Sequence, residues 1–341
     1  MNKFLPFLIL LCAATLFAQN RVIAYFPHWA QYSQFTPKDV RYDFVTDIRY
    51  GYLTPSGSEL LFADESDKEN FLALVSQAKA AKVKLSVAVG GVGSEAAMKE
   101  ANLAEAVKKF QKEYGINAFE LDGGAISAED LPKLLKQAAD LANDGLIVSV
   151  AVPGIESLAS SVLWVGADVS KIDNISLWFT DEASANDPQV KPNSNTSNNI
   201  KILAAFANAG VPKNKLVPII PFYGRTFYKA KGLGSPHQGA GSGNDGVLQY
   251  KEIMDKFNKK DAYRVSFDES SKSEVAVNDN ETIVFNGIPS VKAMAEAVES
   301  NGYGGVAAFD ISGDRREPII SLLVTIGQVL RPHIDYKKKR K

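Results

Sequence analysis

The feature of this sequence that most limits its fold is a regular alternation of strand-like and helix-like segments. Between short runs rich in β-branched residues, apolar residues recur three and four positions apart, as on one face of a helix. The strand-like runs are residues 22–26, 44–53, 83–89, 116–121, 146–152, 175–179, 216–220 and 305–309. Helical patterns cover residues 71–78, 95–114, 128–141, 200–209, 291–298 and about 318–330. Eight buried strands that alternate with helical patterns predict an α/β fold of the (βα)8 TIM-barrel type.

A doubly wound open sheet is the alternative fold. It calls for a glycine-rich phosphate loop after the first strand, and Pro27-His28-Trp29 stands there instead. One segment breaks the rhythm, because residues 232–287 combine a Gly/Ser-rich loop with short β-like runs and a helix at 250–257. We therefore predict one domain over residues 19–330, with a small α+β insertion at about 232–288, between the seventh strand and the seventh helix.

The two ends of the chain have compositions of their own. Lys3 precedes an uncharged apolar run at residues 4–17 and a plausible cleavage point at Ala18, so residues 1–18 predict a signal peptide. The other interpretation is a membrane anchor, but this run is short for a span, which needs about 20 residues. We expect a secreted or periplasmic protein with no integral membrane segment. Residues 331–341 end in a basic tail, which we interpret as a solvated terminus. The alternative is a segment that adheres to an acidic cell surface or polymer.

Charge and metal-ligand patterns exclude several functions. The chain has 38 Lys and Arg against 39 Asp and Glu, so its net charge of −1 gives no sign of a nucleic-acid partner. Its three histidines, His28, His237 and His333, are far apart and show no metal-ligand spacing. We expect neither a metal nor a cofactor.

Aromatic and acidic residues gather where the predicted strands end. In such barrels the chemistry lies at the carboxyl ends of the strands. Aromatic faces stack on the apolar faces of sugar rings, whereas carboxylates and arginines bind hydroxyl and amide groups. The other interpretation of about half of these aromatics is that they fill the barrel. The residues concerned are Tyr25, Phe26, Trp29, Tyr50, Tyr52, Glu120, Asp122, Trp178, Phe179, Asp181, Phe222, Tyr223, Arg225, Phe309 and Asp310.

Three segments resemble a known family. Residues 22–30 (VIAYFPHWA), 216–227 (LVPIIPFYGRTF) and 302–310 (GYGGVAAFD) resemble the first, seventh and eighth strands of the family 18 glycoside hydrolases, the chitinases and their relatives. The predicted insertion lies where many members carry a small α+β insertion. The resemblance covers residues 21–328 and implies a TIM barrel that binds glycans containing N-acetylglucosamine.

The sequence departs from the family at its catalytic motif. The family pattern D-G-x-D-x-D-x-E corresponds to residues 117–124 (NAFELDGG). Asp122 keeps the third aspartate, Glu120 replaces the second, and Gly124 stands where the family has its catalytic glutamate. Other differences lie nearby: the family motif S-x-G-G is AVGG at 88–91, and M-x-Y-D is WFTD at 178–181, so that Thr180 replaces a tyrosine. The family's tryptophan on the last strand is Phe309.

These departures decide what chemistry the resemblance still implies. In the family the acetamide of the sugar attacks, an aspartate orients that acetamide, and the glutamate protonates the leaving oxygen. Gly124 has no proton to give, and general acid catalysis contributes ~10²–10⁴-fold to a rate. Residues 120, 122 and 124 alternate on a strand and so share one face. Glu120 is open to two interpretations, a ligand-facing pair with Asp122 or an interior ion pair with Arg49 or Arg225.

We therefore predict a chitinase-like, carbohydrate-binding protein without catalytic residues. One alternative is a divergent active glycosidase whose acid is Asp181 or Glu182, and another is a scaffold that binds protein or a non-sugar ligand. The predicted partner is a glycan or polysaccharide. The residues expected to contact it are Tyr25, Glu120, Asp122, Trp178, Asp181, Tyr223, Arg225 and Phe309.

Overall fold

The computed structural model describes residues 20–124, 126–160, 164, 168–258 and 262–336. The signal peptide predicted at residues 1–18 and the last residues of the basic tail lie outside these ranges. Within the described ranges, none of the helices combines the length and the hydropathy that a bilayer-spanning segment needs.

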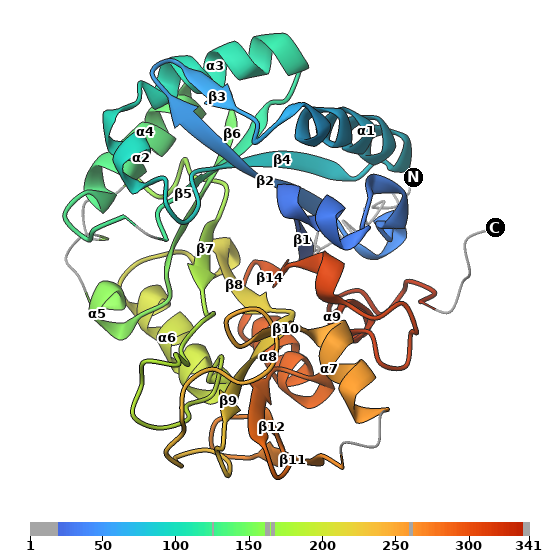
Figure 1. The fold of residues 1–341 in the computed structure, drawn as a ribbon. Coiled ribbons are helices and arrows are strands. Elements are labelled where there is room, and N and C mark those ends of the chain that lie inside the picture. The colour runs from blue at the N-terminus through green and yellow to red at the C-terminus, as the bar shows by residue number, and fades with distance from the viewer. Residues whose placement is uncertain (1–19, 125, 161–163, 165–167, 259–261, 337–341) are drawn as a thin grey trace, which may run out of the picture.

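Eight parallel strands close into a barrel (Figure 1). β1 pairs with β14 on one side and with β2 on the other, which completes the ring; Ala24, for example, lies opposite both Ala308 and Ile48. A short antiparallel strand, β3 (Glu59–Leu61), extends β2. The predicted (βα)8 TIM barrel is therefore confirmed. Its strands are β1 (Arg21–Pro27), β2 (Asp47–Ser56), β4 (Lys84–Val89), β5 (Ala118–Asp122), β6 (Ile147–Pro153), β7 (Ile175–Trp178), β8 (Leu216–Pro221) and β14 (Gly305–Phe309).

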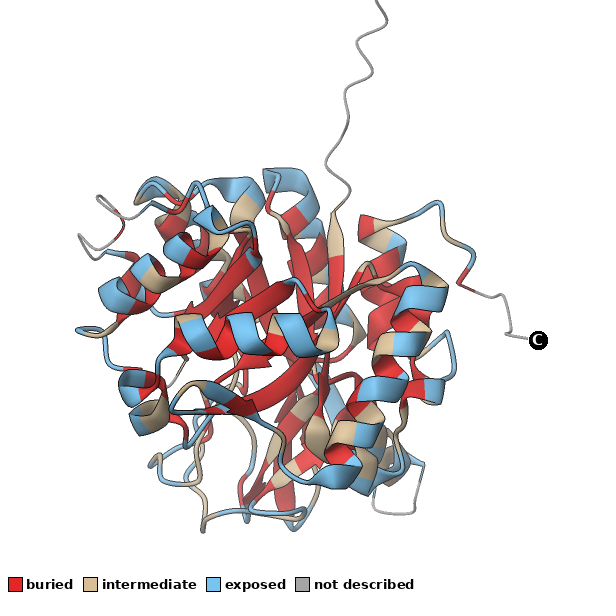
Figure 2. Ribbon diagram, turned by 90° about the horizontal axis from the view of Figure 1, so that it is seen from above, coloured by how far each residue is buried: buried red, intermediate tan, exposed pale blue. Residues whose placement is uncertain are grey.

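Helices cover the outside of the barrel, with their buried sides against the strands (Figure 2). The single helix predicted over residues 95–114 is two helices, because the chain breaks at Ala101 and Asn102, whose side chain accepts a hydrogen bond from the backbone nitrogen of Glu105. The α-helices around the barrel are α1 (Glu65–Ala81), α2 (Glu95–Glu100), α3 (Leu103–Tyr114), α4 (Leu131–Asn143), α5 (Glu156–Ala159), α6 (Thr196–Asn208), α8 (Ile288–Asn301) and α9 (Leu322–Leu330). Short 3₁₀ turns lie at His28–Ser33, Pro37–Asp39, Tyr42–Phe44, Lys213–Lys215 and Ile311–Gly313.

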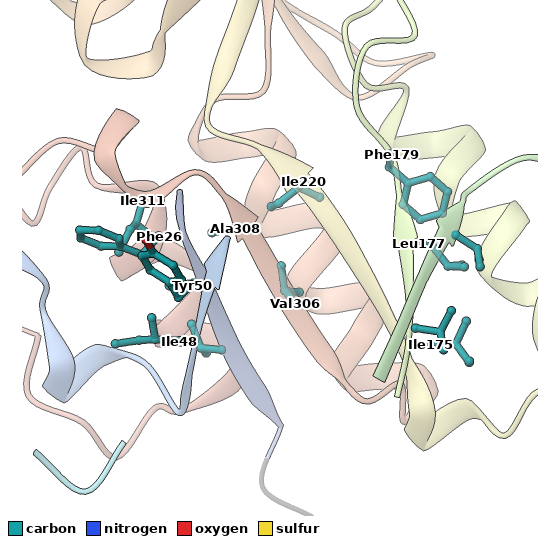
Figure 3. Close-up of a cluster of buried hydrophobic side chains, with 14 of the residues drawn as sticks. Phe26, Ile48, Tyr50, Ile175, Leu177, Phe179, Ile220, Val306, Ala308 and Ile311 are labelled. Atoms are coloured by element: carbon teal, nitrogen blue, oxygen red, sulfur yellow. The ribbon is translucent and has the colours of Figure 1, made fainter. Parts of the chain in front are cut away.

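Side chains alternate between two cores, as the period of a strand requires. On β1, Val22 and Phe26 pack outward under the helices, whereas Ile23 and Tyr25 fill the barrel. Figure 3 shows ten labelled members of the outer core, among them Phe26 and Tyr50 in one group and Leu177 and Phe179 in another. The inner core is smaller, which leaves room inside the barrel for polar side chains.

A second sheet follows β8 and precedes α8, at the bottom of the view in Figure 1. It is antiparallel, with the order β10-β9-β13-β12-β11, and carries helix α7 (Tyr250–Phe257). The insertion was predicted to begin at about residue 232. The second sheet begins earlier, because residues 223–228 already form one of its strands. Its strands are β9 (Tyr223–Tyr228), β10 (Val247–Gln249), β11 (Arg264–Asp268), β12 (Ser273–Val277) and β13 (Glu281–Phe285).

Candidate functional site

A cavity of about 420 Å³ opens where the barrel strands end. Its size suits a small ligand or part of a polymer. A larger recess, of about 1250 Å³, lies around Arg21 and Asp173, at the amino-terminal ends of the strands, where barrels carry stability rather than chemistry. The residues that line the 420 Å³ cavity are His28, Trp29, Tyr52, Thr54, Gly90, Gly91, Val92, Asp122, Gly124, Pro153, Ile155, Trp178, Thr180, Asp181 and Phe309.

Asp122, the last residue of β5, is the carboxyl group deepest in this cavity. Its Oδ1 accepts hydrogen bonds from the backbone nitrogen of Gly124 at 2.8 Å and from Nε1 of Trp178 at 3.1 Å. Burial first, and then the negative charge of Glu120, raise the pKa of Asp122 to about 7. Near neutral pH this carboxyl group therefore exists in both forms, and its protonated form can donate a hydrogen bond to a ligand.

Glu120 lies one layer below the cavity and does not line it. Its side chain is fully buried and forms an ion pair with Arg49 from β2. The hydroxyl groups of Tyr25 and Ser176 donate to its two oxygens, at 2.5 and 3.0 Å. Of the two interpretations drawn from the sequence, the geometry is that of the interior ion pair with Arg49. Tyr25 is buried in the same layer.

Trp178 and Gly124 fit each other closely. A Cβ atom on Gly124 would lie 2.8 Å from both Cδ1 and Nε1 of Trp178, so the indole fills the space that any side chain at position 124 needs. The indole also packs against the rings of Tyr25 and Phe309, at centroid distances of 5.6 and 4.9 Å. A side chain at position 124 would therefore require the tryptophan to move.

A second carboxylate, Asp181, lines the cavity after the end of β7. Its backbone has a φ of 58°, and its side chain is held by the residues that open β9. The Tyr223 hydroxyl donates to Oδ2 at 2.6 Å, and Nε of Arg225 donates to Oδ1 at 3.0 Å. Burial first, and then the charge of Asp181, raise the pKa of Tyr223 well above its usual value, so this hydroxyl stays a donor. Tyr223 and Arg225 thus orient a cavity carboxylate without lining the cavity themselves.

Glu182, the other alternative acid, is engaged elsewhere. Its Oε1 accepts hydrogen bonds from the backbone nitrogen of Asn195 at 3.0 Å and from Nδ2 of Asn199 at 2.9 Å, at the start of α6. It does not line the cavity. Within the described ranges, no group of three or more His, Cys, Asp or Glu side chains is arranged to hold a metal ion.

Several cavity residues were not among the predicted contacts. Trp29 and Tyr52 stack on one wall, with ring centroids 6.3 Å apart and planes inclined by 21°. Trp29 follows the predicted strand 22–26 and Tyr52 lies near the end of the predicted strand 44–53, so both belonged to the aromatic group noted in the sequence, but their depth in the barrel did not follow from their spacing. Val92 and Ile155 are single apolar residues in loops, a pattern that gives no signal in a sequence.

An eight-stranded barrel with an aromatic, acidic cavity at the carboxyl ends of its strands defines the class of TIM barrels that bind a ligand at this face. The profile of "Glycosyl hydrolases family 18" matches residues 21–314, so the chain belongs to that family, as the resemblance implied. Chitinase 1 of Aphanocladium album is 24% identical over 353 residues, which cover 86% of this chain and 81% of that protein. Chitotriosidase-1 of Mus musculus is also 24% identical, over 86% of this chain and 73% of its own length.

Solved structures show the same fold. The crystal structure of the Ostrinia furnacalis Group IV chitinase aligns with a TM-score of 0.80 at 23% identity. The alignment covers 91% of this chain and 99% of that one.

Proposed function

We propose that this chain is a chitinase-like protein that binds a glycan containing N-acetylglucosamine and does not hydrolyse it by the family mechanism. Two similar structures motivate the choice of ligand: an Ostrinia furnacalis chitinase in complex with allosamidin, and a mutant of a Nicotiana class V chitinase in complex with NAG4. We further propose that the mature domain spans residues 19–330 and is exported by the leader at residues 1–18.

The observation that carries this proposal is the fit of Trp178 against Gly124. The position that holds the family's acid has no side chain, and the indole occupies the adjoining space. Asp181 is engaged by Tyr223 and Arg225, and Glu182 lies outside the cavity. Loss of a positioned acid costs ~10²–10⁴-fold in rate.

The cavity retains the means to bind a sugar. Four aromatic side chains line it, and such rings stack on the apolar face of a pyranose. Asp122, Thr180 and Asp181 supply hydrogen-bonding groups around them. This combination of an apolar wall with a few polar groups is typical of small-molecule sites. The aromatic residues are Trp29, Tyr52, Trp178 and Phe309.

One observation favours the second candidate, a slow glycosidase. Asp122 is a cavity carboxyl group whose pKa is raised to about 7, the property that general acids have in hydrolases. Its Oδ1 already accepts two hydrogen bonds, and it lies on the strand below the position of the family's acid. We therefore assign to it ligand binding rather than catalysis.

A glycan array with a parallel assay of reducing-end release tests the proposal, using the wild-type chain and two variants of Trp178. We expect the wild type to bind chito-oligosaccharides without cleaving them. Trp178→Ala should lose at least ~10-fold in affinity while its melting temperature stays within a few degrees. Trp178→Phe keeps an aromatic ring without the Nε1 donor, so its affinity should lie between that of the wild type and that of Trp178→Ala. Unchanged affinity in a folded Trp178→Ala variant, or an array with no bound glycan, would contradict the proposal.

A further inference from the structure

Two exposed apolar side chains stand at the mouth of the cavity. Val92 is 99% exposed and Ile155 is 49% exposed, and both line the cavity. They follow β4 and β6, the two strands that flank β5 in the sheet. They therefore lie on either side of the strand that ends at Asp122 and leads into Gly124. Single exposed apolar residues are ordinary on a surface, but a pair that frames one cavity position calls for an explanation.

The turn that carries Val92 is held firmly. A Cβ atom on Gly91, whose φ is 87°, would lie 2.9 Å from the ring of Tyr52, so the backbone here rests directly on that ring. The backbone nitrogen and the hydroxyl group of Ser94 both donate to the carbonyl oxygen of Gly91, at 3.2 and 2.5 Å. Val92 projects to solvent from a backbone that is fixed on its inner side.

Ile155 is placed in a similar way. The backbone nitrogen of Gly154 donates to the carbonyl oxygen of Trp178 at 3.0 Å, and a Cβ atom on Gly154 would overlap the Phe179 ring. Gly154 is therefore packed tightly against β7. Ile155 follows it in an extended conformation, and α5 begins at the next residue. The backbone that carries each apolar side chain is thus held in place before any ligand arrives, which lowers the entropic cost of binding.

Polar groups are distributed unevenly around this mouth. Two of the side chains suited to sugar hydroxyl groups, Thr180 and Asp181, follow β7, whereas Asp122 lies deeper in the cavity at the end of β5. Among the described residues that line the cavity on this side, Val92, Gly124 and Ile155 have no hydrogen-bonding side chain. A hydroxylated sugar ring in this position would lose hydrogen bonds to water and gain few in return, which is costly.

We infer that the part of the ligand that leaves the cavity past Gly124 is an apolar substituent, an aryl or alkyl group attached to the sugar, which rests on Val92 and Ile155. This inference depends on the proposed function, because it places the sugar itself in the cavity. It names the chemical class of the ligand more closely, as a glycoside with an apolar aglycone.

Calorimetric titration of the full chain with methyl and phenyl β-chitobioside tests this inference. Burial of the phenyl group should make the phenyl glycoside bind roughly tenfold more tightly. Val92→Ser/Ile155→Ser should reduce that ratio to about twofold. Ile319→Ser is the matched control, since Ile319 is 85% exposed and does not line the cavity, and it should keep the full ratio.

The outcomes separate this inference from the proposed function. Equal affinity for the two glycosides in the wild type overturns the apolar subsite and leaves the sugar site intact. A tenfold ratio that survives in the double serine variant also overturns it, because the phenyl group then binds elsewhere. If neither glycoside binds and free chitotetraose does not bind either, the proposed function fails and the inference fails with it.

Discussion

Gly124 and Trp178 depend on each other, because the indole occupies the volume that a side chain at position 124 would fill. The contact distance of 2.8 Å from a Cβ atom on residue 124 is shorter than real Cβ contacts, so one of the two groups has to move when a side chain is added. The substitution Gly124→Glu alone therefore also disturbs the tryptophan, its hydrogen bond to Asp122, and its packing on Phe309.

This dependence gives a prediction for hydrolysis. Gly124→Glu alone should release no more reducing ends from chito-oligosaccharides than the wild type. Gly124→Glu/Trp178→Met, which also puts the family's methionine at position 178, should exceed the single variant by at least ~10-fold, within the range expected for a positioned general acid. Thr180 and Phe309 still differ from the family, so we expect the double variant to remain slow. Equal rates for the single and double variants would show that Trp178 does not obstruct this position.

Asp122 gives a prediction about pH. Its pKa is 3.8 without perturbation and about 7 in the folded chain, so the folded state binds the proton more tightly than the unfolded state. The stability that this proton contributes is fully present below pH 4 and is lost as the pH rises through about 7. Asp122→Asn removes the titration and keeps an oxygen for Gly124 and Trp178. Relative to the wild type, this variant should gain about 2–3 kcal/mol in unfolding free energy between pH 5 and pH 8.

Urea unfolding of both proteins at the two pH values measures this gain. The comparison with Asp122→Asn is needed because burial also raises the pKa of Asp314, to about 6, and that of Glu274, so the wild type loses stability over this range for other reasons too. A constant difference between variant and wild type across the range would contradict the raised pKa of Asp122.

Single residues also show how much of the site could be predicted from the sequence. The period of a strand places Glu120 and Asp122 on one face, and both point into the barrel. The period does not tell how far along the barrel axis each side chain lies. Glu120 and Asp122 are only two residues apart on β5, yet one forms a buried ion pair and the other lines the cavity. The sequence also could not tell which arginine pairs with Glu120. That depends on which strand carries an arginine at the same level along the barrel axis, and the level is set only when the barrel closes.

At the scale of elements, a polar cluster links β1, β2, β5 and β7 inside the barrel. Arg49 of β2 forms the ion pair with Glu120 of β5, and it also donates to Oγ of Ser176 at 2.7 Å and, through its second nitrogen, to Oδ1 of Asn174 at 2.8 Å. Desolvation makes such a pair costly to form, but removing one partner is more costly still, because a buried charge is left without compensation. The cluster therefore ties the floor of the cavity to strands on different sides of the barrel.

Removing either charge of this pair should destabilise the whole domain. Arg49→Met or Glu120→Gln should each lower the unfolding free energy by ~3–5 kcal/mol, as measured by urea denaturation. Lys136→Met is the control, because its pair with Asp140 on α4 is exposed, and it should change stability by less than about 1 kcal/mol. A loss at Arg49 no larger than that at Lys136 would show that the interior pair does not hold the barrel together.

Among the elements, the barrel strands were predicted best, because burial alone determines their sequence pattern. The barrel strands are buried on both faces and read as continuous apolar runs, so each was located within a few residues. The break between α2 and α3 was missed, because Ala101 and Asn102 do not interrupt the apolar spacing, while the amide of Asn102 caps the second helix. β9 was missed as part of the insertion because its residues, Tyr223–Tyr228, follow β8 almost without a break.

At the scale of the whole molecule, the fold separates stability from binding. Helices and strands form the outer core, and an ion-pair layer fills the middle of the barrel. The aromatic cavity lies above that layer, at the carboxyl ends of the strands. β9 of the insertion contributes Tyr223 and Arg225, which orient Asp181 at the cavity edge. The barrel itself followed from the sequence, but this contact between the insertion and the cavity did not, because it depends on how β9 leaves β8.

The central claim is that this cavity holds a chitin-type oligosaccharide without cleaving it. Calorimetric titration of the purified chain with chitotetraose, followed after a day by mass analysis of the sugar in the same cell, tests binding and cleavage together. We predict saturable binding and a tetramer that is recovered intact. Recovery of shorter fragments, at a turnover within about tenfold of ordinary enzyme rates of ~1–10³ s⁻¹, would contradict the claim, as would a titration with no heat of binding.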